Sequence, residues 1–386
     1  MKRIYLDNNA TTPIHPEVAE FVEPFLKGLF GNPSSLHWAG REVRGYYDRA
    51  QEQVAGLINA RPNEIVFTSC GTESDNHAIK GTAYAKNNQG RHIITTTIEH
   101  PGVLNTCRYL ETKGYEVTYL PVDGYGRLEP EDVKKAIRDD TILISVMYAN
   151  NETGTLLPIK EIGGIAHDRG IIFHSDMVQA IGKIGIDMYV LNVDLASFSG
   201  HKVYATKGVG ALYIKEGLDI DNLIHGGHQE AGRRAGTENM IGIVALGKAC
   251  ELIKEEMTTE NGKVEALRKK LLKGITDSID HVRLNGHPEY RLPNTLNISI
   301  EYVEAESLLI ALDFNGIAVS SGSACSSGST EPSHVLLSMD IPPEICQSAI
   351  RMSLGRENTE EDVDYALSVM PEVVNRLREM SPFYKK

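Results

Sequence analysis

Residues 170–202 read GIIFHSDMVQAIGKIGIDMYVLNVDLASFSGHK. Two short apolar runs lie in this stretch, Gly170–Ser175 and Leu195–Ser199, and a charged residue closely follows each of them. Asp176 comes directly after the first run, and Lys202 comes three residues after the second. Continuous apolar runs of this length predict strands that are buried on both faces of a sheet. The stretch therefore predicts two buried strands with a carboxylate and an amine near their ends.

Five more runs of the same kind flank this stretch, and helical pattern separates most of them. They are residues 64–69 (EIVFTS), 92–97 (HIITTT), 116–121 (EVTYLP), 141–149 (TILISVMYA) and 208–214 (GVGALYI). Strands that alternate with helices predict βαβ units and a parallel sheet. Only a short stretch separates the last two of the seven runs, which favours an antiparallel pair. We expect an α/β fold with a mainly parallel, seven-stranded sheet.

After about residue 250 the regular alternation of strand and helix patterns ends, and the sequence predicts a smaller α+β domain. Residues 251–279 have apolar side chains at helical spacing, and residues 295–300 and 317–321 resemble strands. Thr359, followed by three acidic residues, predicts the start of a final helix. We expect an N-terminal segment that packs with the small domain (1–14), a large domain (15–255) and a small domain (256–386).

Composition narrows the class of protein. The chain has 386 residues, of which 41% are hydrophobic and 24% are charged, and its formal net charge is −13. These values are typical of a globular protein and exclude a disordered or fibrous one. An acidic chain without a block of basic residues argues against nucleic acid and against an anionic membrane as partners.

Neither targeting nor membrane signals stand out. The N-terminal residues 1–7 (MKRIYLD) lack the apolar region of a signal peptide, and no apolar run reaches the roughly 20 residues that a membrane helix needs. We therefore expect a cytoplasmic protein. The five cysteines are scattered without a C-x-x-C pair, so no disulfide framework or zinc site is predicted. His225 and His228 flank two glycines and lack further ligands nearby, so we predict no metal.

Polar residues follow several of the predicted strands, where ligands collect in open α/β sheets. Gly71 and Thr72 open a helix and could bind a phosphate, although taken alone this stretch favours a simple helix cap. His100 could act on a ligand or serve as a structural histidine, and Asn151 could bind a ligand or belong to an Asx turn. Each of these signals is weak by itself.

Taken together, the strand ends match the needs of one cofactor. Pyridoxal phosphate needs a lysine for its aldehyde, a carboxylate for its ring nitrogen and donors for its phosphate. Lys202 can supply the amine and Asp176 the carboxylate, because a lysine near a buried strand end is uncommon unless it has a function. Gly71 and Thr72 can supply the phosphate donors.

Cys325 differs from the other four cysteines in its surroundings. It lies within residues 320–329 (SSGSACSSGS), which contain only small residues and cannot form a hydrophobic core. Such a sequence is typical of a solvated, mobile loop. An exposed free thiol is reactive, so we interpret Cys325 as a nucleophile that travels, with a flexible linker as the alternative interpretation.

These residues, together with motifs along nearly the whole chain, resemble the cysteine desulfurases of the NifS/IscS group, which belong to the class-V aminotransferases. The motifs are residues 5–12 (YLDNNATT), 31–35 (GNPSS), 71–74 (GTES), 99–100 (EH), 150–154 (NNETG), 176–180 (DMVQA), 199–202 (SGHK), 234–237 (RAGT), 321–325 (SGSAC), 331–336 (EPSHVL) and 350–353 (IRMS). The chain departs from the usual pattern at Cys70, at Met177 and at Ala205-Thr206.

The resemblance implies a fold-type-I enzyme that uses pyridoxal 5′-phosphate and works as a homodimer. It implies that Lys202 binds the cofactor covalently, that Asp176 pairs with the ring nitrogen and that His100 stacks on the ring. It further implies phosphate or ring contacts from Gly71, Thr72, Gln179, Ser199, His201 and, from the partner chain, Thr237. Asn151 and Arg351 would hold the substrate carboxylate, which suits the planar guanidinium of arginine.

The implied reaction takes sulfur from L-cysteine, leaves L-alanine and forms a persulfide on Cys325. The persulfide would then pass to an acceptor, for which an iron–sulfur cluster scaffold protein is the usual partner in this group. Two alternatives stay open. One is another enzyme with the same cofactor, such as a transaminase or a selenocysteine lyase, which would not need Cys325. The other is a non-catalytic iron–sulfur assembly scaffold, although such a protein would not need Lys202.

Overall fold

A computed structural model describes residues 2–321, 332–382 and 384. Its larger sheet has seven strands in the order β2-β8-β7-β6-β5-β3-β4. The strands are β2 (Ile65–Thr68), β3 (His92–Thr96), β4 (Glu116–Leu120), β5 (Thr141–Ser145), β6 (Ile172–Asp176), β7 (Leu195–Ser199) and β8 (Gly210–Ile214). Only β8 runs antiparallel to its neighbours, β2 and β7. The prediction of a mainly parallel sheet with an antiparallel final pair is confirmed.

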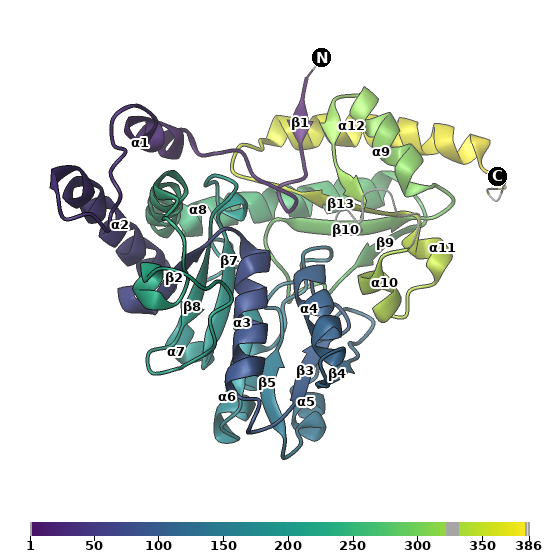
Figure 1. Cartoon of the computed structure of the whole chain (residues 1–386). Helices are drawn as coiled ribbons and strands as arrows, with labels where there is room; N and C mark the ends of the chain where they lie inside the picture. Colours follow the sequence, from purple (N-terminus) through teal and green to yellow (C-terminus); the bar gives the residue numbers. More distant parts are fainter. Residues whose placement is uncertain (1, 322–331, 383, 385–386) are drawn as a thin grey trace.

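Helices cover both faces of this sheet (Figure 1). The helices α3 (Gly71–Ala85) and α4 (Pro101–Glu111) bury their apolar side chains against one face. The other face packs against α1 (Pro16–Lys27), α2 (Trp38–Leu57), α6 (Ile159–Asp168), α7 (Met188–Leu191) and the first part of α8 (Met240–Ser278). The remaining short helices are α5 (Pro130–Ala136) and the 3-10 turns η1 (Pro62–Glu64), η2 (Gly200–Lys202) and η3 (Gln229–Gly232).

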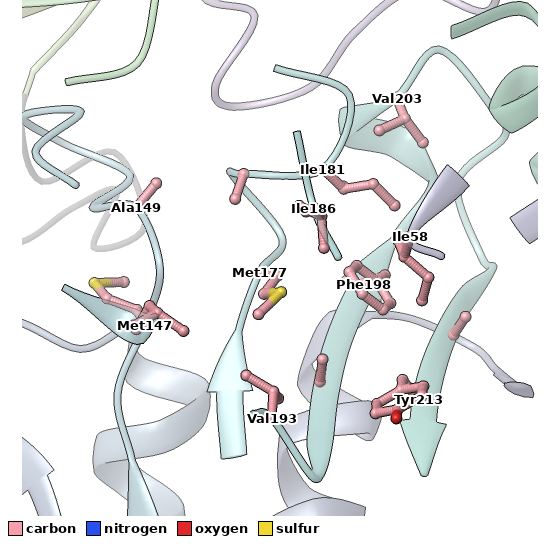
Figure 2. Close-up of a cluster of buried hydrophobic side chains, with 14 of the residues drawn as sticks. Ile58, Met147, Ala149, Met177, Ile181, Ile186, Val193, Phe198, Val203 and Tyr213 are labelled. Carbon is pink, nitrogen blue, oxygen red and sulfur yellow. The ribbon is translucent and has the colours of Figure 1, made fainter. Parts of the chain in front are cut away.

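On the face of the sheet that packs against α1, α2, α6, α7 and α8, an apolar cluster holds the strands in place. Figure 2 shows Phe198 of β7 and Tyr213 of β8 beside Ile58 and Met177. Met177 is fully buried, so the residue that departs from the family pattern packs in the core and not in a cavity. Strands buried on both faces explain the continuous apolar runs in the sequence.

A second, smaller sheet forms the centre of a separate apolar core. It has the antiparallel order β12-β13-β10-β9, with β9 (Val282–Asn285), β10 (Thr295–Ile300), β12 (Ser320–Ser321) and β13 (Ala349–Ser353). The helices α9 (Ala305–Phe314) and α12 (Glu360–Met380) pack in its apolar cluster, whereas the short helices α10 (His334–Ser338) and α11 (Pro343–Cys346) bury their apolar side chains in the larger core. Thr359 and Asp362 form a capping box at the start of α12, which confirms the predicted helix start.

The start of the N-terminal segment packs with this smaller unit. Strand β1 (Ile4–Tyr5) pairs in parallel with β11 (Ile317–Ala318). Ile4 and Leu6 pack in the same apolar cluster as the smaller sheet. This placement brings residues 7–10 across to the polar edge of the larger sheet, where Thr12 donates its backbone N–H to the carbonyl of His201.

Helix α8 belongs to both apolar cores. Its residues 243–252 pack in the larger core, and its residues 264–275 pack in the smaller one. The helix is longer than the pattern over 251–279 indicates, and it passes through the predicted boundary between residues 255 and 256. We propose that the three-part division still describes the chain, because the apolar contacts of α8 change from one core to the other close to that boundary. None of the described helices combines the length and the apolar character that crossing a membrane requires.

Candidate active site

A cavity of about 300 Å³ lies where the carboxyl ends of the parallel strands meet the N-terminal segment. It collects most of the residues that the sequence singled out. Ten predicted site residues line it: Gly71, Thr72, His100, Asn151, Asp176, Gln179, Ser199, His201, Lys202 and Arg351. These residues come from six separate segments of the chain, so their convergence is a strong indication of a functional site.

Lys202 places its amine in this cavity because β7 ends at Ser199 and the turn η2 follows at once. Its Nζ donates to the backbone carbonyls of Asn9 and Ala10, at 2.5 and 2.7 Å. The N-terminal segment thus holds the amine at the edge of the larger sheet. Lys202 and Asp176 therefore line the same cavity.

Asp176 is the last residue of β6 and is 6% exposed. One of its oxygens, Oδ1, accepts a hydrogen bond of 2.9 Å from the backbone N–H of Val178. Burial raises the pKa of this carboxyl, while the nearby His100 and Lys202 act in the opposite direction. A buried carboxylate with one backbone donor has capacity for a further N–H donor from a ligand.

Asp75, on the first turns of α3, is a cavity residue that the sequence did not single out. It is 1% exposed, and its Oδ1 has no hydrogen-bond partner among the described residues. One ligand atom from each of Asp75, His100 and Asp176 lies within 4.8 Å of the others. Burial, and then the charge of Asp176, raises the pKa of Asp75 well above its usual value. We therefore assign the proton to Asp75 and the negative charge to Asp176.

His100 caps the start of α4, and this role fixes its ring. Its Nδ1 accepts a hydrogen bond of 3.0 Å from the backbone N–H of Gly102. Because Nδ1 is the acceptor, Nε2 carries the proton in the neutral ring. Both interpretations of His100 from the sequence are therefore compatible with the structure: it is a structural cap, and its ring also lines the cavity.

The opposite end of the cavity offers donors for an anionic group. Helix α3 begins at Gly71, and its N-cap residue Cys70 makes no side-chain hydrogen bond to the first turn. The N-terminus of a 15-residue helix with unused backbone donors favours a phosphate. A Cβ atom at Gly71 would come within 2.7 Å of a methyl carbon of Val178, so this position requires glycine. The same Cβ atom would lie 3.5 Å from the Cβ atom of Ser199, so Ser199 is close to Gly71.

His201 adds a neutral ring to the lining of the cavity. Its Nδ1 lies 3.2 Å from the hydroxyl of Thr11. Burial lowers the pKa of His201 to about 4, and the charges of Lys202 and Lys207 act in the same direction. At neutral pH the ring is therefore uncharged and serves as a hydrogen-bonding group.

Arg351 closes the cavity from the smaller sheet. It belongs to β13 and is 2% exposed. Its two terminal nitrogens donate to the backbone carbonyl of Asn151 at 3.0 Å and to Oδ1 of Asp7 at 2.8 Å. Its Nε has no partner among the described residues. These contacts hold the guanidinium at the cavity and leave donor capacity for a carboxylate.

Asn9 is the second cavity residue to which the sequence assigned no role. Its side chain donates to the carbonyl of Asn151 and to the hydroxyl of Thr295, and its backbone N–H donates to the hydroxyl of Ser353. Asn9 thereby fixes the carbonyl that receives the amine of Lys202. The only sequence signal was its place in the motif of residues 5–12, which carried the resemblance without a role for each residue.

Two predicted site residues do not line this cavity. Thr237 lines a separate cavity of about 120 Å³ together with Ser69, Glu230 and Arg234. Its predicted role concerned a partner chain, and that role stays a prediction. Cys325 lies outside the described residues, so its predicted role as a nucleophile also stays a prediction.

The residues present fit pyridoxal 5′-phosphate. A lysine amine, a buried carboxylate with unused acceptor capacity and a helix N-terminus lie around a single cavity. These are the three groups that bind the aldehyde, the ring nitrogen and the phosphate of this cofactor. The flat ring of His100 lines the cavity as well.

Comparisons with known proteins agree with this site. The aminotransferase class-V family matches residues 4–366. The chain belongs to the cysteine desulfurases of this family. Its cofactor is pyridoxal 5′-phosphate. The chain is 54% identical over 385 residues to the cysteine desulfurase IscS of Methanosarcina thermophila, which covers 100% of this chain and 95% of that protein. It is 53% identical to the protein of the same name from Clostridium botulinum, over 100% and 97% of the two chains.

Solved structures show the same relationship and confirm the fold type. A NifS-like protein superimposes with a TM-score of 0.92 at 41% identity, covering 97% of this chain and 100% of its own. A structure described as SspA in complex with cysteine superimposes with a TM-score of 0.82 at 36% identity, over 92% and 100% of the two chains. The predicted family, the α/β fold and the enzyme class are therefore confirmed.

Proposed function

We propose that this enzyme transfers sulfur from L-cysteine to the thiol of Cys325 and releases L-alanine. The observation that carries the proposal is the convergence of Lys202, Asp176 and Arg351 on one cavity. An amine, a buried carboxylate and a guanidinium suit a cofactor with an aldehyde and a substrate with a carboxylate. The solved structure of SspA with cysteine, which shares this fold at 36% identity, supports the choice of substrate.

The large-sheet residues would hold the cofactor. Lys202 would bind it through the amine, Asp176 through the ring nitrogen, and Gln179 through a ring oxygen. Gly71, Thr72, Ser199 and His201 would bind the phosphate, and His100 would cover the ring. When bound, pyridoxal 5′-phosphate supplies an electron sink that stabilises negative charge on the substrate α-carbon. Asp176 would keep this property available, because a buried carboxylate in the cavity lining can stabilise a protonated ring nitrogen.

Arg351 and Asn151 would orient the substrate. Asp7 aligns the guanidinium of Arg351 and leaves Nε and further N–H donors for the substrate carboxylate. A fixed guanidinium restricts the rotation of a small amino acid, so the α-proton points to a defined side of the cavity. The side chain of Asn151 lines the cavity next to Arg351 and can donate to the same carboxylate.

Two groups would move protons. The amine of Lys202, held by two backbone carbonyls, takes the proton from the substrate α-carbon. His100 presents Nε2 as the atom that gives or takes a proton, since Nδ1 is engaged by the backbone of Gly102. This arrangement gives each proton transfer its own base.

The sulfur transfer itself would use Cys325 as a thiolate. Its sulfur attacks the sulfur of the bound cysteine, so an S–S bond forms and the C–S bond breaks. The electron pair of the C–S bond remains with carbon, which gains a proton and leaves as the methyl group of alanine. The thiolate of Cys325 thus becomes a persulfide without an external oxidant.

The residues on either side of the Cys325 segment support this step. Ser320 pairs with Arg351 in the register of β12 and β13. On the other side, Ser333 donates to Glu152, and His334 lies 3.0 Å from the carbonyl of Glu99, next to His100. Cys325 comes four positions after Ser321 in the sequence, and four steps of extended chain span at most about 14 Å. The segment therefore starts and ends close to the cavity.

The remaining partners are proposed from the relatives. We propose that the enzyme supplies sulfur to an iron–sulfur cluster scaffold and works in the cytoplasm, and its 53–54% identity to proteins named cysteine desulfurase IscS supports the sulfur-supplying role. We also propose a homodimer, in which Thr237 of one chain reaches the cofactor phosphate of the other. Analytical ultracentrifugation of the loaded enzyme tests this assembly.

The proposed function is tested by alanine formation from L-cysteine. The loaded enzyme should release alanine, and Cys325→Ser should lose persulfide formation while the visible band of the cofactor is kept. Cys107→Ser, which changes a buried thiol on α4, is the matched control and should leave both unchanged. A Cys325→Ser variant with full desulfurase activity would favour another enzyme of the same cofactor class, such as a selenocysteine lyase. A wild-type protein without a visible band would favour the non-catalytic scaffold.

A further inference from the structure

A second amine lies behind the cofactor cavity and is connected to it. The Nζ of Lys183 donates to the backbone carbonyl of Gln179 at 3.2 Å and to Oε1 of the same residue at 2.9 Å. The Nε2 of Gln179 donates to the backbone carbonyl of Asn9 at 3.0 Å. That same carbonyl accepts from the Nζ of Lys202. A continuous chain of hydrogen bonds therefore joins Lys183 to Lys202.

The chemistry of the partners fixes the direction of the Gln179 amide. The Nζ of Lys183 donates to the oxygen of the amide, and it donates to the backbone carbonyl of the same residue as well. A backbone carbonyl can only accept, so Asn9 requires the nitrogen of the amide. Gln179 is 5% exposed, so few water molecules can stabilise the opposite orientation. Its N–H edge therefore faces the side on which Asn9 and the cofactor cavity lie.

The surroundings of Lys183 disfavour a positive charge on its amine. It lines a small cavity of about 60 Å³ with Lys202, Glu256, Glu260 and Arg356, and it forms no ion pair within the described part of the chain. Burial lowers the pKa of Lys183 to about 7, and the charges of Lys202 and Arg351 act in the same direction. The side chain of Asn261 holds the backbone of this turn by donating to the carbonyl of Lys183 at 2.9 Å.

We propose that Lys183 is a positioning residue that fixes the amide of Gln179 with its N–H edge toward the cofactor. The inference rests on the proposed function, because Gln179 is one of the residues that we expect to hold the cofactor. A donor from Gln179 stabilises negative charge on a ring oxygen of the cofactor. Through this donor, Lys183 would lower the pKa of the bound cofactor at its link to the nitrogen of Lys202.

The test is the pH midpoint of the visible band of the loaded enzyme, measured without cysteine. Lys183→Met should raise this midpoint by about one pH unit, the size expected for one hydrogen bond to a charged group. Gln179→Ala should raise it by a similar amount. Adding Lys183→Met to Gln179→Ala should then produce no further shift, because the lysine acts through the amide.

Two variants serve as controls for charge and for folding. Lys215→Met removes an amine that pairs with Asp194, and its midpoint should equal that of the wild type. Lys183→Arg keeps a donor, so it should also keep the wild-type midpoint. If Lys183→Met does not bind the cofactor, the midpoint of Lys183→Arg tests the inference instead.

The inference is overturned by any of three results. The first is an unchanged midpoint in Lys183→Met. The second is a midpoint that rises by a further full pH unit when Lys183→Met is added to Gln179→Ala. The third is a midpoint in Lys183→Arg that rises as much as it does in Lys183→Met. The second result would mean that the charge of Lys183 acts directly on Lys202. Because cysteine is absent, these results do not depend on the desulfurase reaction, whereas a wild-type protein without a visible band would contradict the cofactor assignment itself.

Discussion

The two walls of the cavity are built in different ways. One, here called the sheet wall, consists of residues at or shortly after the carboxyl ends of strands of the larger sheet, such as Asp176 and Lys202. The other, here called the terminal wall, consists of Asn9 and Arg351, which are far apart in the sequence. Hydrogen bonds over more than 340 residues hold the terminal wall together, among them the bond from Arg351 to Asp7.

This difference indicates a division of work. The sheet wall carries the groups that suit the cofactor, so its substitutions should remove chemistry. The terminal wall carries the guanidinium that suits a substrate carboxylate, so its substitutions should weaken substrate binding first. Changes in kcat and KM can therefore separate the two walls.

The largest effect is expected from Lys202→Ala, on the sheet wall. The variant removes the amine that binds the cofactor and moves the α-proton, so activity should fall on the order of 10⁴-fold or more, and the visible band should shift. Alanine release and the absorption spectrum measure both effects. Lys207→Ala, which changes an exposed lysine five residues along, should be close to wild type. Substantial desulfurase activity in Lys202→Ala would break the assignment of the sheet wall.

A second contrast lies within the sheet wall. Asp176→Asn removes the negative charge that faces the ring nitrogen, so kcat should fall by about 10²-fold or more. Asp75→Asn replaces a carboxyl that burial already keeps protonated, and kcat should change by less than about 3-fold. Steady-state kinetics of the two variants decide between these roles. Equal losses would show that the charge is not confined to Asp176.

The terminal wall should respond through KM. Arg351→Lys cannot bind a carboxylate through two parallel N–H groups, so the KM for cysteine should rise by about 10–100-fold with the visible band retained. Asp7→Asn leaves the guanidinium in place but weakens its alignment, and the rise should be about 3–10-fold. Arg283→Lys, on strand β9, is the control. Loss of the band in Arg351→Lys would contradict the division between the walls.

The smallest effect concerns stability and pH. Glu99, next to His100 in the sequence, is fully buried, and burial raises its pKa from 4.5 to about 8 in the folded protein. The folded state therefore binds a proton that the unfolded state has lost, so this contribution to stability falls as pH rises from about 5 through about 8. Glu99→Gln should reduce that fall, with a melting temperature about 3 °C higher than the wild type at pH 9.

Calorimetry between pH 6 and pH 9 measures this difference. Glu129→Gln, at an exposed helix start, should follow the wild type at every pH. A Glu99→Gln profile parallel to the wild type would show that Glu99 is ionised throughout the range.

The sheet wall could be predicted from the sequence because strand and functional residue are neighbours in the chain. A buried apolar run fixes the strand, and the next polar residue then falls at the carboxyl edge of the sheet. This reasoning found Asp176 and Lys202 before any resemblance was considered. It located β5 less well, since the apolar run over 141–149 continues after the strand ends at Ser145. The backbone N–H of Met147 instead donates to Glu99.

The terminal wall could not be predicted in this way. Nothing local in residues 7–10 or in β13 indicates that they meet, because the contact depends on β1 pairing with β11 and on the bridge from Asp7 to Ser353. Arg351 was found only through the resemblance, and Asn9 received no role. Asp75 was missed because its place in the first turns of a helix has an ordinary explanation as a charge that favours the helix N-terminus.

The most direct test of the account is to locate the sulfur after the loaded enzyme meets L-cysteine under anaerobic conditions. Peptide mass spectrometry should find an added mass of about 32 Da, one sulfur atom, on Cys325, with an equal amount of alanine in solution. Cys70 is the informative competitor, because its thiol lines the cavity. Sulfur on Cys70 with none on Cys325, or alanine release without any persulfide on the protein, would contradict the account.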